Sequence, residues 1–300
     1  MTRIMLALLM GFLACDSAAS RTPSEQPMRV VSLAPHLTEL VYTLDAEKHL
    51  VGAVEWSDYP EAAQALPRIG DAFRFDLERI VALETTHALS WVGGTPLAAV
   101  EQLQSLGIEV IELETQTLDQ IADALRQLGA LLGQQAHAAA AVAEYDRRRS
   151  AYEQRVAERP QIDVFYQVSE RPLFTLGGPH VINEVFELCG ARNVFEGLNT
   201  EASVVGREAV IGLQPDAMIA GQNQPALISA EQHGQRSALD HWLEYPHIPA
   251  VACGHLWLVD PALLVRPTPR ILDGADRLCE WLDQVRQHLA EDPACSNDRG

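Results

Sequence analysis

The stretch QQAHAAAAVAEYDRRRSAYEQRVAER occupies residues 134–159 and contains neither glycine nor proline. Its residue types favour helix, so the stretch predicts one uninterrupted helix of about 39 Å at ~1.5 Å per residue. Pro160 follows and ends the helix, because proline cannot donate a backbone hydrogen bond. The length and central position of this helix favour a rigid connection between two lobes. One more surface helix is the alternative.

Short β-rich runs alternate with helical patterns on both sides of this stretch. On the N-terminal side, strands are expected at 29–33, 50–54, 88–92 and 109–113, separated by segments with apolar residues at helical spacing. On the C-terminal side, the alternation returns at 163–168, 181–190, 207–213, 217–221 and 256–260, before a long helix at about 268–290. This order predicts an α/β fold with a mostly parallel sheet in each lobe.

Two helix ends are marked by local chemistry. Gly107 follows a helical pattern at 96–106, and glycine readily adopts the left-handed conformation that ends a helix. Thr117 and Gln120 form a T-x-x-Q sequence, which predicts a capping box at the start of a helix over 118–132.

The two halves of the chain contain an internal repeat. Residues 37–52 align without gaps on 182–197, which matches Glu39 with Glu184. Residues 77–91 align on 207–221, which matches Glu78 with Glu208. Both matches occur in the same order and flank the central stretch, so they indicate two equivalent lobes around a cleft.

The first residues have the features of an export signal. Arg3 precedes an apolar run from Ile4 to Ala14, which is too short to span a bilayer but suits a signal peptide over residues 1–14.

The segment after the apolar run resembles a lipid attachment site. The sequence FLAC at 12–15 resembles a bacterial lipobox, so we expect lipidation of Cys15, with a plain signal peptide as the alternative. Asp16 predicts retention on the inner membrane, and residues 15–27 form a lipidated cysteine followed by a flexible tether.

The composition limits the function classes. The 300 residues correspond to about two domains at ~150 residues each. Asp and Glu number 41 against 22 Lys and Arg, which gives a formal charge of −19 and argues against nucleic-acid binding. Apolar residues make up 47% of the chain, as in globular proteins.

The residues that follow the predicted strands are the candidates for a ligand site, because parallel sheets bind ligands beyond the carboxyl ends of their strands. The segments concerned are 34–36, 55–59, 91–95, 169–174 and 222–223. They contain Trp56, Tyr59 and Trp91, and an aromatic cleft suits a large, flat, partly apolar ligand. Core packing of these rings is the alternative.

Sequence motifs of enzymes are largely absent. The chain has no G-x-S-x-G, H-E-x-x-H, P-loop or G-x-G-x-x-G sequence. His36 with Glu39 and His241 with Glu244 form two H-x-x-E pairs that could share a helix face and bind a metal. They leave a metal-dependent hydrolase as a competing hypothesis, although such pairs often arise by chance.

Five segments of the chain resemble the periplasmic cobalamin-binding proteins of ABC importers. They are RVVSLAPHLTELVYTL (29–44), VGAVEWSDYPEAAQALPRIGDAF (51–73), DLERIVAL (76–83), VFYQVSERPLFTLGG (164–178) and RPTPRILDGADRLC (266–279). The combination of SDYP, LERIVAL and W-x-G-G is fairly specific for that family. The resemblance implies a class III binding protein, in which two doubly wound α/β lobes are joined by one long rigid helix.

The resemblance also implies a division of the chain. We expect an N-terminal lobe at 28–133, the connecting helix at 134–159 and a C-terminal lobe at 160–290. Residues 291–300 are expected to be a disordered tail.

The family's ligand contacts match seven residues of this chain, four of which are aromatic. His36 is expected to touch the edge of the corrin ring or an axial group, with a polar loop residue as the alternative. Arg266 is expected to bond a ligand amide, with an ordinary ion pair as the alternative. The seven residues are Pro35, His36, Trp56, Tyr59, Trp91, Phe174 and Arg266.

The chain departs from its enteric relatives at two positions. Ala72 and Ala202 stand where those proteins carry tryptophan, with Phe73 and Phe75 near the first of them. The lost ring area weakens the expected pocket and could change the ligand to another corrinoid.

Glu78 and Glu208 match the glutamates with which the family contacts arginines of the permease, one on each lobe. Arginine–carboxylate bonds suit such docking. The alternative is that each acid complements the dipole of the helix it begins.

Cys189 and Cys279 match a pair that forms a disulfide in the family. Cys253 and Cys295 have no matched partner, and no Cys/His spacing resembles a zinc site.

The resemblance implies a protein that captures cobalamin or a related corrinoid and delivers it to an inner-membrane ABC permease dimer. Cobalamin would be cargo rather than cofactor, and we expect no enzymatic activity, no resident metal and a monomer anchored in the periplasm by its lipid. Alternatives are a sensor, or a haem or ferric-siderophore binder of the same fold. Siderophores are usually anionic, and only Arg171 and Arg266 lie in suggestive places to bind one.

Overall fold

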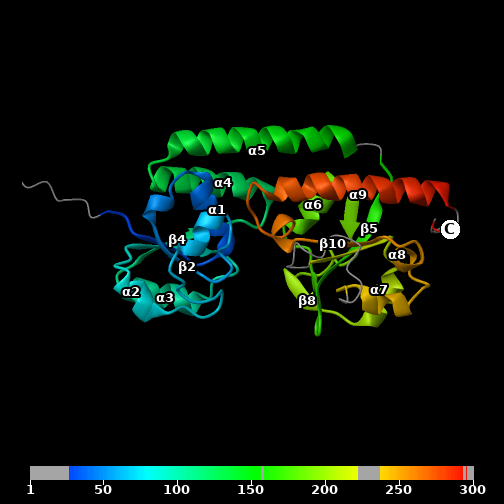
Figure 1. The fold of residues 1–300 in the computed structure, drawn as a ribbon, viewed down its shortest axis with the longest axis horizontal. Helices are drawn as coiled ribbons and strands as arrows, with labels where there is room; N and C mark the ends of the chain where they lie inside the picture. The colour runs from blue at the N-terminus through cyan, green and yellow to red at the C-terminus, as the bar shows by residue number, and fades with distance from the viewer. Residues whose placement is uncertain (1–26, 157–158, 222–236, 293–294, 296–300) are drawn as a thin grey trace, which may run out of the picture.

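The computed structural model describes residues 27–156, 159–221, 237–292 and 295. Its elements form two α/β lobes, and the 22-residue helix α5 (Gln135–Val156) runs along one edge of both (Figure 1). The predicted signal peptide, Cys15 and all but the last residue of the predicted tether lie outside this part of the chain. None of the helices in the described part combines the length and apolarity that crossing a membrane requires.

The N-terminal lobe contains a four-stranded sheet in the order β2-β1-β3-β4, in which every neighbouring pair is parallel. All four predicted strands are found, each within one residue at either end. The strands are β1 (Val30–Ser32), β2 (Leu50–Ala53), β3 (His87–Trp91) and β4 (Glu109–Leu113). The α-helices of this lobe are α1 (Pro35–Thr43), α2 (Leu77–Ala82), α3 (Leu97–Ser105) and α4 (Leu118–Leu131), with short 3-10 helices η1 (Glu47–His49) and η2 (Glu61–Ala65).

The C-terminal lobe contains the same parallel unit, because the order β7-β5-β9-β10 repeats β2-β1-β3-β4. Its strands are β5 (Ile162–Glu170), β6 (Leu173–Leu176), β7 (Ala191–Asn193), β8 (Ala202–Val204), β9 (Ala217–Gly221) and β10 (Leu256–Val259). Its α-helices are α6 (Ile182–Leu188), α7 (Arg207–Leu213), α8 (Pro249–Ala252) and α9 (Ile271–Glu291), with 3-10 helices η4 (Asp240–Glu244) and η5 (Pro261–Leu263).

The second sheet is mostly parallel, as predicted, but it also contains two antiparallel strands that the first sheet lacks. Strand β6 pairs antiparallel with β5, and β8 pairs antiparallel with β6, which gives the order β5-β6-β8. Only Arg171 and Pro172 separate β5 from β6, so a hairpin takes the place of a crossover here. Proline is tolerated poorly inside strands and favoured in turns, and Pro172 was the available signal for this turn.

The structure bears out the internal repeat. Helices α1 and α6 occupy the first pair of aligned segments, and α2 followed by β3 is matched by α7 followed by β9 in the second. Strands β3 and β9 begin at His87 and Ala217, which are equivalent at the offset of the second alignment. The two lobes are therefore equivalent units, and β6 and β8 are additions to the second one.

Local chemistry sets several helix ends as predicted. The Thr117 side chain accepts a hydrogen bond from the Gln120 backbone, and the Gln120 side chain accepts one from the Thr117 backbone, so the capping box of α4 is present. Gly107 adopts a φ of +79° just beyond α3. Helix α9 begins three residues later than expected, because Thr268 precedes a proline and such residues avoid helical backbone.

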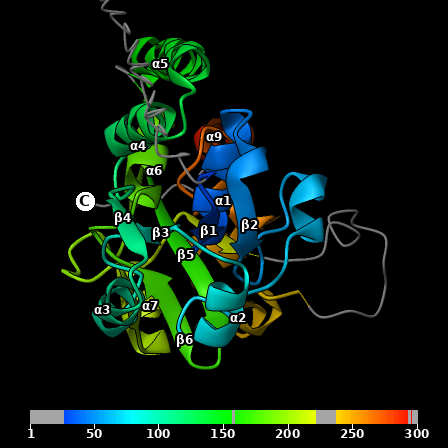
Figure 2. The same ribbon diagram turned by 90° about the vertical axis from the view of Figure 1, so that its left-hand side faces the viewer.

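Helix α5 is joined to a helix of each lobe by a buried tyrosine. The hydroxyl of Tyr145 donates to the carbonyl of Leu118 at the start of α4 (3.1 Å). The hydroxyl of Tyr152 donates to the carbonyl of Leu272 at the start of α9 (3.0 Å). Two views at right angles show α5 lying over α4 (Figure 1, Figure 2). The connecting helix thus contacts both lobes near the point where they meet.

The lobes are also tied directly by the two glutamates that match in the repeat. The carboxylate of Glu39, 2% exposed on α1, accepts from Arg270 Nε (2.7 Å) and Nη2 (2.8 Å) and from Thr268 Oγ1 (2.7 Å). The carboxylate of Glu184 on α6 accepts from the backbone N–H of Leu118 (2.7 Å). Glu39 therefore contacts the residues just before α9, and Glu184 contacts the first residue of α4, in each case in the other lobe. We call these contacts the cross-lobe ties.

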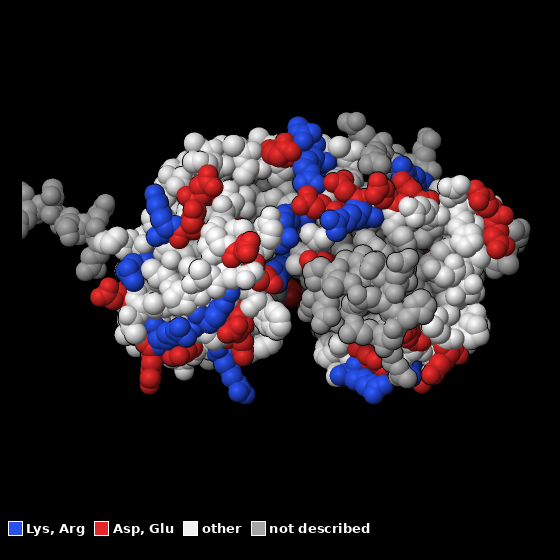
Figure 3. All heavy atoms as spheres, viewed as in Figure 1, with Lys and Arg blue, Asp and Glu red and all other residues white. Residues whose placement is uncertain are grey.

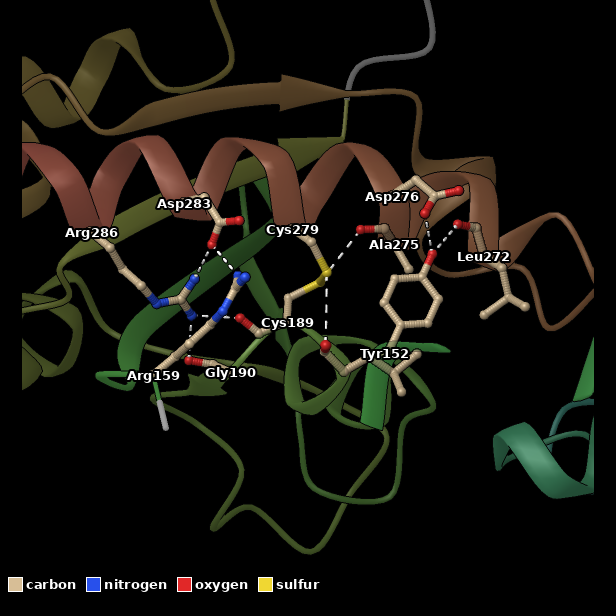
Figure 4. The surroundings of a disulfide bond; sticks show 11 residues. Tyr152, Arg159, Cys189, Gly190, Leu272, Ala275, Asp276, Cys279, Asp283 and Arg286 are labelled. Atoms are coloured by element: carbon tan, nitrogen blue, oxygen red, sulfur yellow. Dashed lines mark hydrogen bonds and ion pairs between the residues drawn. A yellow bond between two sulfur atoms is a disulfide. The ribbon is translucent and has the colours of Figure 1, made fainter. Parts of the chain in front are cut away.

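A disulfide joins Cys189 at the end of α6 to Cys279 on α9, the pair expected from the sequence (Figure 4). Arg286, further along α9, donates to the carbonyl of Gly190 (2.8 Å) beside it. The bond closes a sequence separation of 90 residues, which contributes about 4 kcal/mol in the chain-entropy model. It fixes the equivalent of α1 in the second lobe against the last helix.

A second disulfide joins Cys253 to Cys295, a pair that the sequence left without assignment. Cys295 is buried, and Glu291 still belongs to α9. Within the predicted disordered tail over 291–300, Glu291 and Cys295 are therefore ordered, because the disulfide holds Cys295 against the end of α8. Residues 293–294 and 296–300 are not among those described.

The cross-lobe ties give a stability prediction. Glu39→Gln should lower the free energy of unfolding by about 3 kcal/mol, because it leaves the half-buried guanidinium of Arg270 without its carboxylate. Urea unfolding followed by circular dichroism measures the change. Glu280→Gln, at an exposed position of α9, is the control and should change the value by less than about 0.5 kcal/mol. Equal stability of the two variants would contradict the tie.

Candidate functional site

Two cavities lie between the lobes, at the carboxyl ends of parallel strands from both sheets, and they share Val265 and Arg266. Figure 3 shows the notch that separates the lobes on one face of the molecule. The larger, of about 490 Å³, is the aromatic cavity, lined by Trp56, Asp58, Tyr59, Gln64, Asp260, Pro261, Ala262, Val265, Arg266 and Arg270. The smaller, of about 130 Å³, is the histidine cavity, lined by Pro35, His36, Trp91, Thr115, Gln116, Pro179, His180, Val181, Glu201, Val265, Arg266 and Pro267.

The aromatic cavity is formed by the loop after β2 and the loop after β10. Trp56 has a left-handed backbone (φ +66°) and a side chain that is 69% exposed. This conformation costs a non-glycine residue about 1–3 kcal/mol, and such strain concentrates at functional sites. The backbone carbonyl of Trp56 accepts a hydrogen bond from Arg266 Nη2 (3.2 Å), which helps to hold the loop in this conformation. The ring of Trp56 is thereby presented to the cleft.

Both arginines of the cavity are already paired with carboxylates of the N-terminal lobe. Arg266 Nη1 donates to Asp58 Oδ1 (2.7 Å), and Arg270 is bound by Glu39. The guanidinium of Arg270 also lies 3.5 Å from the centre of the Tyr59 ring, a cation–π contact. The segment that carries both arginines therefore closes one side of the cleft without leaving an unpaired positive charge.

His36 and Trp91 form one wall of the histidine cavity. Their rings meet edge to face with 5.2 Å between centroids, and His36 Nε2 hydrogen-bonds Thr115 Oγ1 (3.2 Å). Burial, and secondarily the positive charge of Arg266, lowers the pKa of His36 to about 3. His36 is therefore neutral in the folded protein. Pro35 begins α1 beside it, a position where a missing backbone N–H costs nothing.

The opposite wall belongs to the C-terminal lobe and was not foreseen from the sequence. His180 Nδ1 accepts the backbone N–H of Ile182 (3.1 Å), and burial lowers the pKa of His180 to about 4. Gln116 Nε2 donates to Glu201 Oε1 (2.6 Å), a bond that joins the two lobes. Gln116 follows the carboxyl end of β4, so the strand-end rule was a usable signal for it.

Six of the seven predicted ligand contacts line these two cavities. Phe174 does not line either: it pairs with Ser169 in the β5–β6 hairpin, which extends past the end of β9. Ala72 and Ala202, where the chain departs from its relatives, are likewise absent from both linings. Residues 222–223, predicted after β9, belong to the part of the chain that the structure does not describe.

The two H-x-x-E pairs do not form metal sites among the described residues. The carboxylate of Glu39 is occupied by Arg270 and Thr268, and neither pair gathers a third ligating side chain. Among the described residues, His288, Asp292 and Cys295 do bring three possible metal-ligating atoms close together. The sulfur of Cys295, however, is bonded to Cys253. The hydrolase hypothesis therefore lacks the ligand geometry that it predicted.

Glu78 and Glu208 are exposed in the first turns of α2 and α7. These helices lie on the same side of the two lobes, opposite to α5 (Figure 1). The repeat thus places one exposed carboxylate on each lobe at equivalent positions of one face.

A third hollow, of about 590 Å³, lies within the C-terminal lobe and is lined by residues that include Asp163, Arg192 and Gln214. Asp163 stands at the amino end of β5, so this groove opens at the end of the sheet opposite to the cleft. Arg192 is paired with Asp163, with Arg192 Nη2 2.8 Å from Asp163 Oδ1, and Glu196 is a second acid of the lining. We call it the C-lobe groove.

Comparison with known proteins gives consistent results. Residues 30–263 match the model of a family described as periplasmic binding protein. The vitamin B12-binding protein of Vibrio campbellii is 31% identical over 288 residues, which cover 96% of this chain and 99% of that protein.

Solved structures show the same architecture. The periplasmic vitamin B12 binding protein of Vibrio cholerae aligns with a TM-score of 0.75 at 30% identity, covering 86% of this chain and 97% of the other. A periplasmic haem-binding protein from Pseudomonas aeruginosa aligns with a TM-score of 0.72 at 26% identity, covering 85% and 92%. These matches confirm the predicted fold class.

The lowered pKa of His36 gives a pH prediction. The unfolded chain takes up a proton at His36 near pH 6.5, whereas the folded chain resists it down to about pH 3, so the free energy of unfolding falls as the pH decreases between these values. Denaturant unfolding between pH 4 and 6 should show a slope about 1.4 kcal/mol per pH unit steeper in the native sequence than in His36→Gln. Parallel slopes would mean that His36 is not held neutral by the fold.

Proposed function

Because this chain belongs to the periplasmic binding protein family, we propose that it captures cobalamin or a related corrinoid between its lobes and delivers it to an inner-membrane ABC importer. The aromatic cavity carries the proposal, because strand ends of both lobes present exposed rings and apolar side chains there. The named relatives of similar length support the same ligand class.

The chemistry of the cleft suits a large, flat and mostly neutral ring system. Trp56 and Tyr59 offer ring faces, and apolar stacking needs no charge on the ligand. Two neutral imidazoles and an indole line the adjoining cavity. Ring contacts and neutral hydrogen-bonding groups suit binding and orientation, so we propose that cobalamin is cargo and that the protein catalyses no reaction on it.

The proposed delivery uses Glu78 and Glu208. Two exposed carboxylates at equivalent positions of one face can meet two equivalent arginines of a symmetric permease dimer, because charge-assisted arginine–carboxylate bonds orient such encounters. A single copy of this chain supplies both carboxylates, so we propose a working monomer.

Family membership indicates a periplasmic location. We propose that the mature chain begins at Cys15 and is anchored to the inner membrane through a lipid on that cysteine, because FLAC at 12–15 resembles a lipobox and Asp16 follows it. The tether then lets the lobes reach the importer in the same membrane. Both disulfides suit this oxidising compartment.

Haem or a ferric siderophore is the second candidate, since a haem-binding protein shares the architecture at 26% identity. Such ligands carry carboxylates or other anionic groups, which require unpaired cations. Arg266 and Arg270 are paired with Asp58 and Glu39, and the largely exposed Arg171 is paired with its neighbour Glu170. The charges of the cleft therefore favour the corrinoid.

Calorimetric titration of residues 28–300 with cyanocobalamin tests the function. We expect a one-to-one complex with a dissociation constant of roughly 1 µM or tighter, weakened about tenfold by Trp56→Ala through lost ring contact. Leu106→Ala, which truncates an exposed side chain outside both cavities, should leave binding unchanged. Comparison with cobinamide, which lacks the lower nucleotide, shows whether the protein contacts that part of the ligand. Absence of binding by folded protein, with haem or a siderophore bound instead, would contradict the proposal.

Charge reversal tests the delivery step. Glu78→Arg combined with Glu208→Arg should abolish corrinoid uptake by cells while cyanocobalamin affinity stays within about twofold, because like charges then face the permease. The control pair, Asp123→Arg and Glu280→Arg, alters exposed acids on α4 and α9, near the edge where α5 lies, and should preserve uptake (Figure 1). Normal uptake with both docking glutamates reversed would refute the assignment.

A further inference from the structure

The histidine cavity presents hydrogen-bond donors that are neutral. Trp91 Nε1–H is buried and has no hydrogen-bond partner among the described residues. His180 accepts a backbone N–H at Nδ1, so its neutral ring carries the proton on Nε2 and can only donate there. A buried donor without an acceptor costs about 1–3 kcal/mol, which an acceptor on a ligand would recover.

The lining of the same cavity contains one carboxylate, that of Glu201. It contains no unpaired cation that could neutralise a second carboxylate brought by a ligand. Glu201 accepts from the amide of Gln116 (2.6 Å) and forms no ion pair within the described part of the chain. Arg266, the only cation in the lining, is paired with Asp58 (2.7 Å). A second carboxylate entering this cavity would therefore meet like charge without compensation.

The size of the cavity points to a side arm rather than a ring. About 130 Å³ equals the liquid volume of roughly four water molecules, which matches a propionamide group. The cavity adjoins the aromatic cavity through Val265 and Arg266, so a ring held in the larger space can place one peripheral arm in the smaller.

We propose that the histidine cavity selects corrinoids by a peripheral carboxamide, with His180 and Trp91 donating to its carbonyl oxygen and Glu201 rejecting a carboxylate in its place. This inference rests on the proposed function and makes it more specific. A carboxamide matches both halves of the site, because its N–H₂ can donate to the free oxygen of Glu201 while its carbonyl accepts. A carboxylate has no donor and brings a repelled charge. The substrate class is therefore a corrinoid that is amidated at the arm held in this cavity.

The test uses cyanocobalamin and the three derivatives in which one propionamide has been hydrolysed to a carboxylic acid. Titration of residues 28–300 at pH 7 should give at least one acid that binds ten or more times more weakly than cyanocobalamin. Glu201→Gln should reduce that penalty, measured as the ratio of the acid's dissociation constant to that of cyanocobalamin in the same variant, to threefold or less. Glu196→Gln, which removes an acid from the C-lobe groove, is the matched control and should keep the full penalty.

His180→Phe provides the second measurement, because it keeps an aromatic ring of similar size but removes the donor. It should weaken the binding of cyanocobalamin at least fivefold. It should weaken the binding of cobinamide by the same factor, since both ligands retain the amide arms.

The outcomes separate this inference from the proposed function. Equal affinity for all three acids and cyanocobalamin, or a penalty that Glu201→Gln does not change, overturns the selection while corrinoid binding stands. Failure of cyanocobalamin itself to bind folded protein overturns the proposed function and this inference together.

Discussion

The buried carboxylate of Glu39 and its bonds to Arg270 and Thr268 fix how the two lobes meet. A buried charge is tolerated only with full compensation, and here all three donors come from the other lobe. Glu184, its equivalent in the repeat, makes the reciprocal contact to the start of α4. Together with α5, these ties hold the two lobes in one relative position. The cleft between the lobes therefore has a defined width, and residues from both of its walls can contact the same ligand.

The same arrangement explains why the cleft offers no unpaired positive charge to a ligand, although two arginines reach it. The arginines that reach the cleft are used to hold the lobes and the Trp56 loop, so they bring no spare positive charge to the ligand. Burial keeps His36 and His180 uncharged as well. Binding then depends on ring contact and on neutral hydrogen bonds, which are the interactions that a corrinoid with amide arms can make and an anionic chelate cannot.

Much of this could be predicted from the sequence where the cause is local. The Thr117 capping box, the strand-end aromatics and the repeat that matches β3 with β9 all depend on residues close in the chain. The predictions failed where the cause is distant. The partner of Glu39 is more than 200 residues away, and His180 and Glu201 reach the cavity only because the second lobe faces the first. The β5–β6 hairpin was also missed, because the alternation of strands and helices gave no sign of the turn at Arg171 and Pro172. Phe174 lies in this hairpin and lines neither cavity.

The most direct test of the account is the position of the cobalt atom in crystals grown with cyanocobalamin, measured by anomalous scattering. The account predicts a single cobalt peak between the lobes, beside Trp56 and Tyr59 and facing the segment that carries Arg266, with the cross-lobe ties intact. A cobalt peak in the C-lobe groove, or one between lobes whose ties to Glu39 have broken, would contradict it.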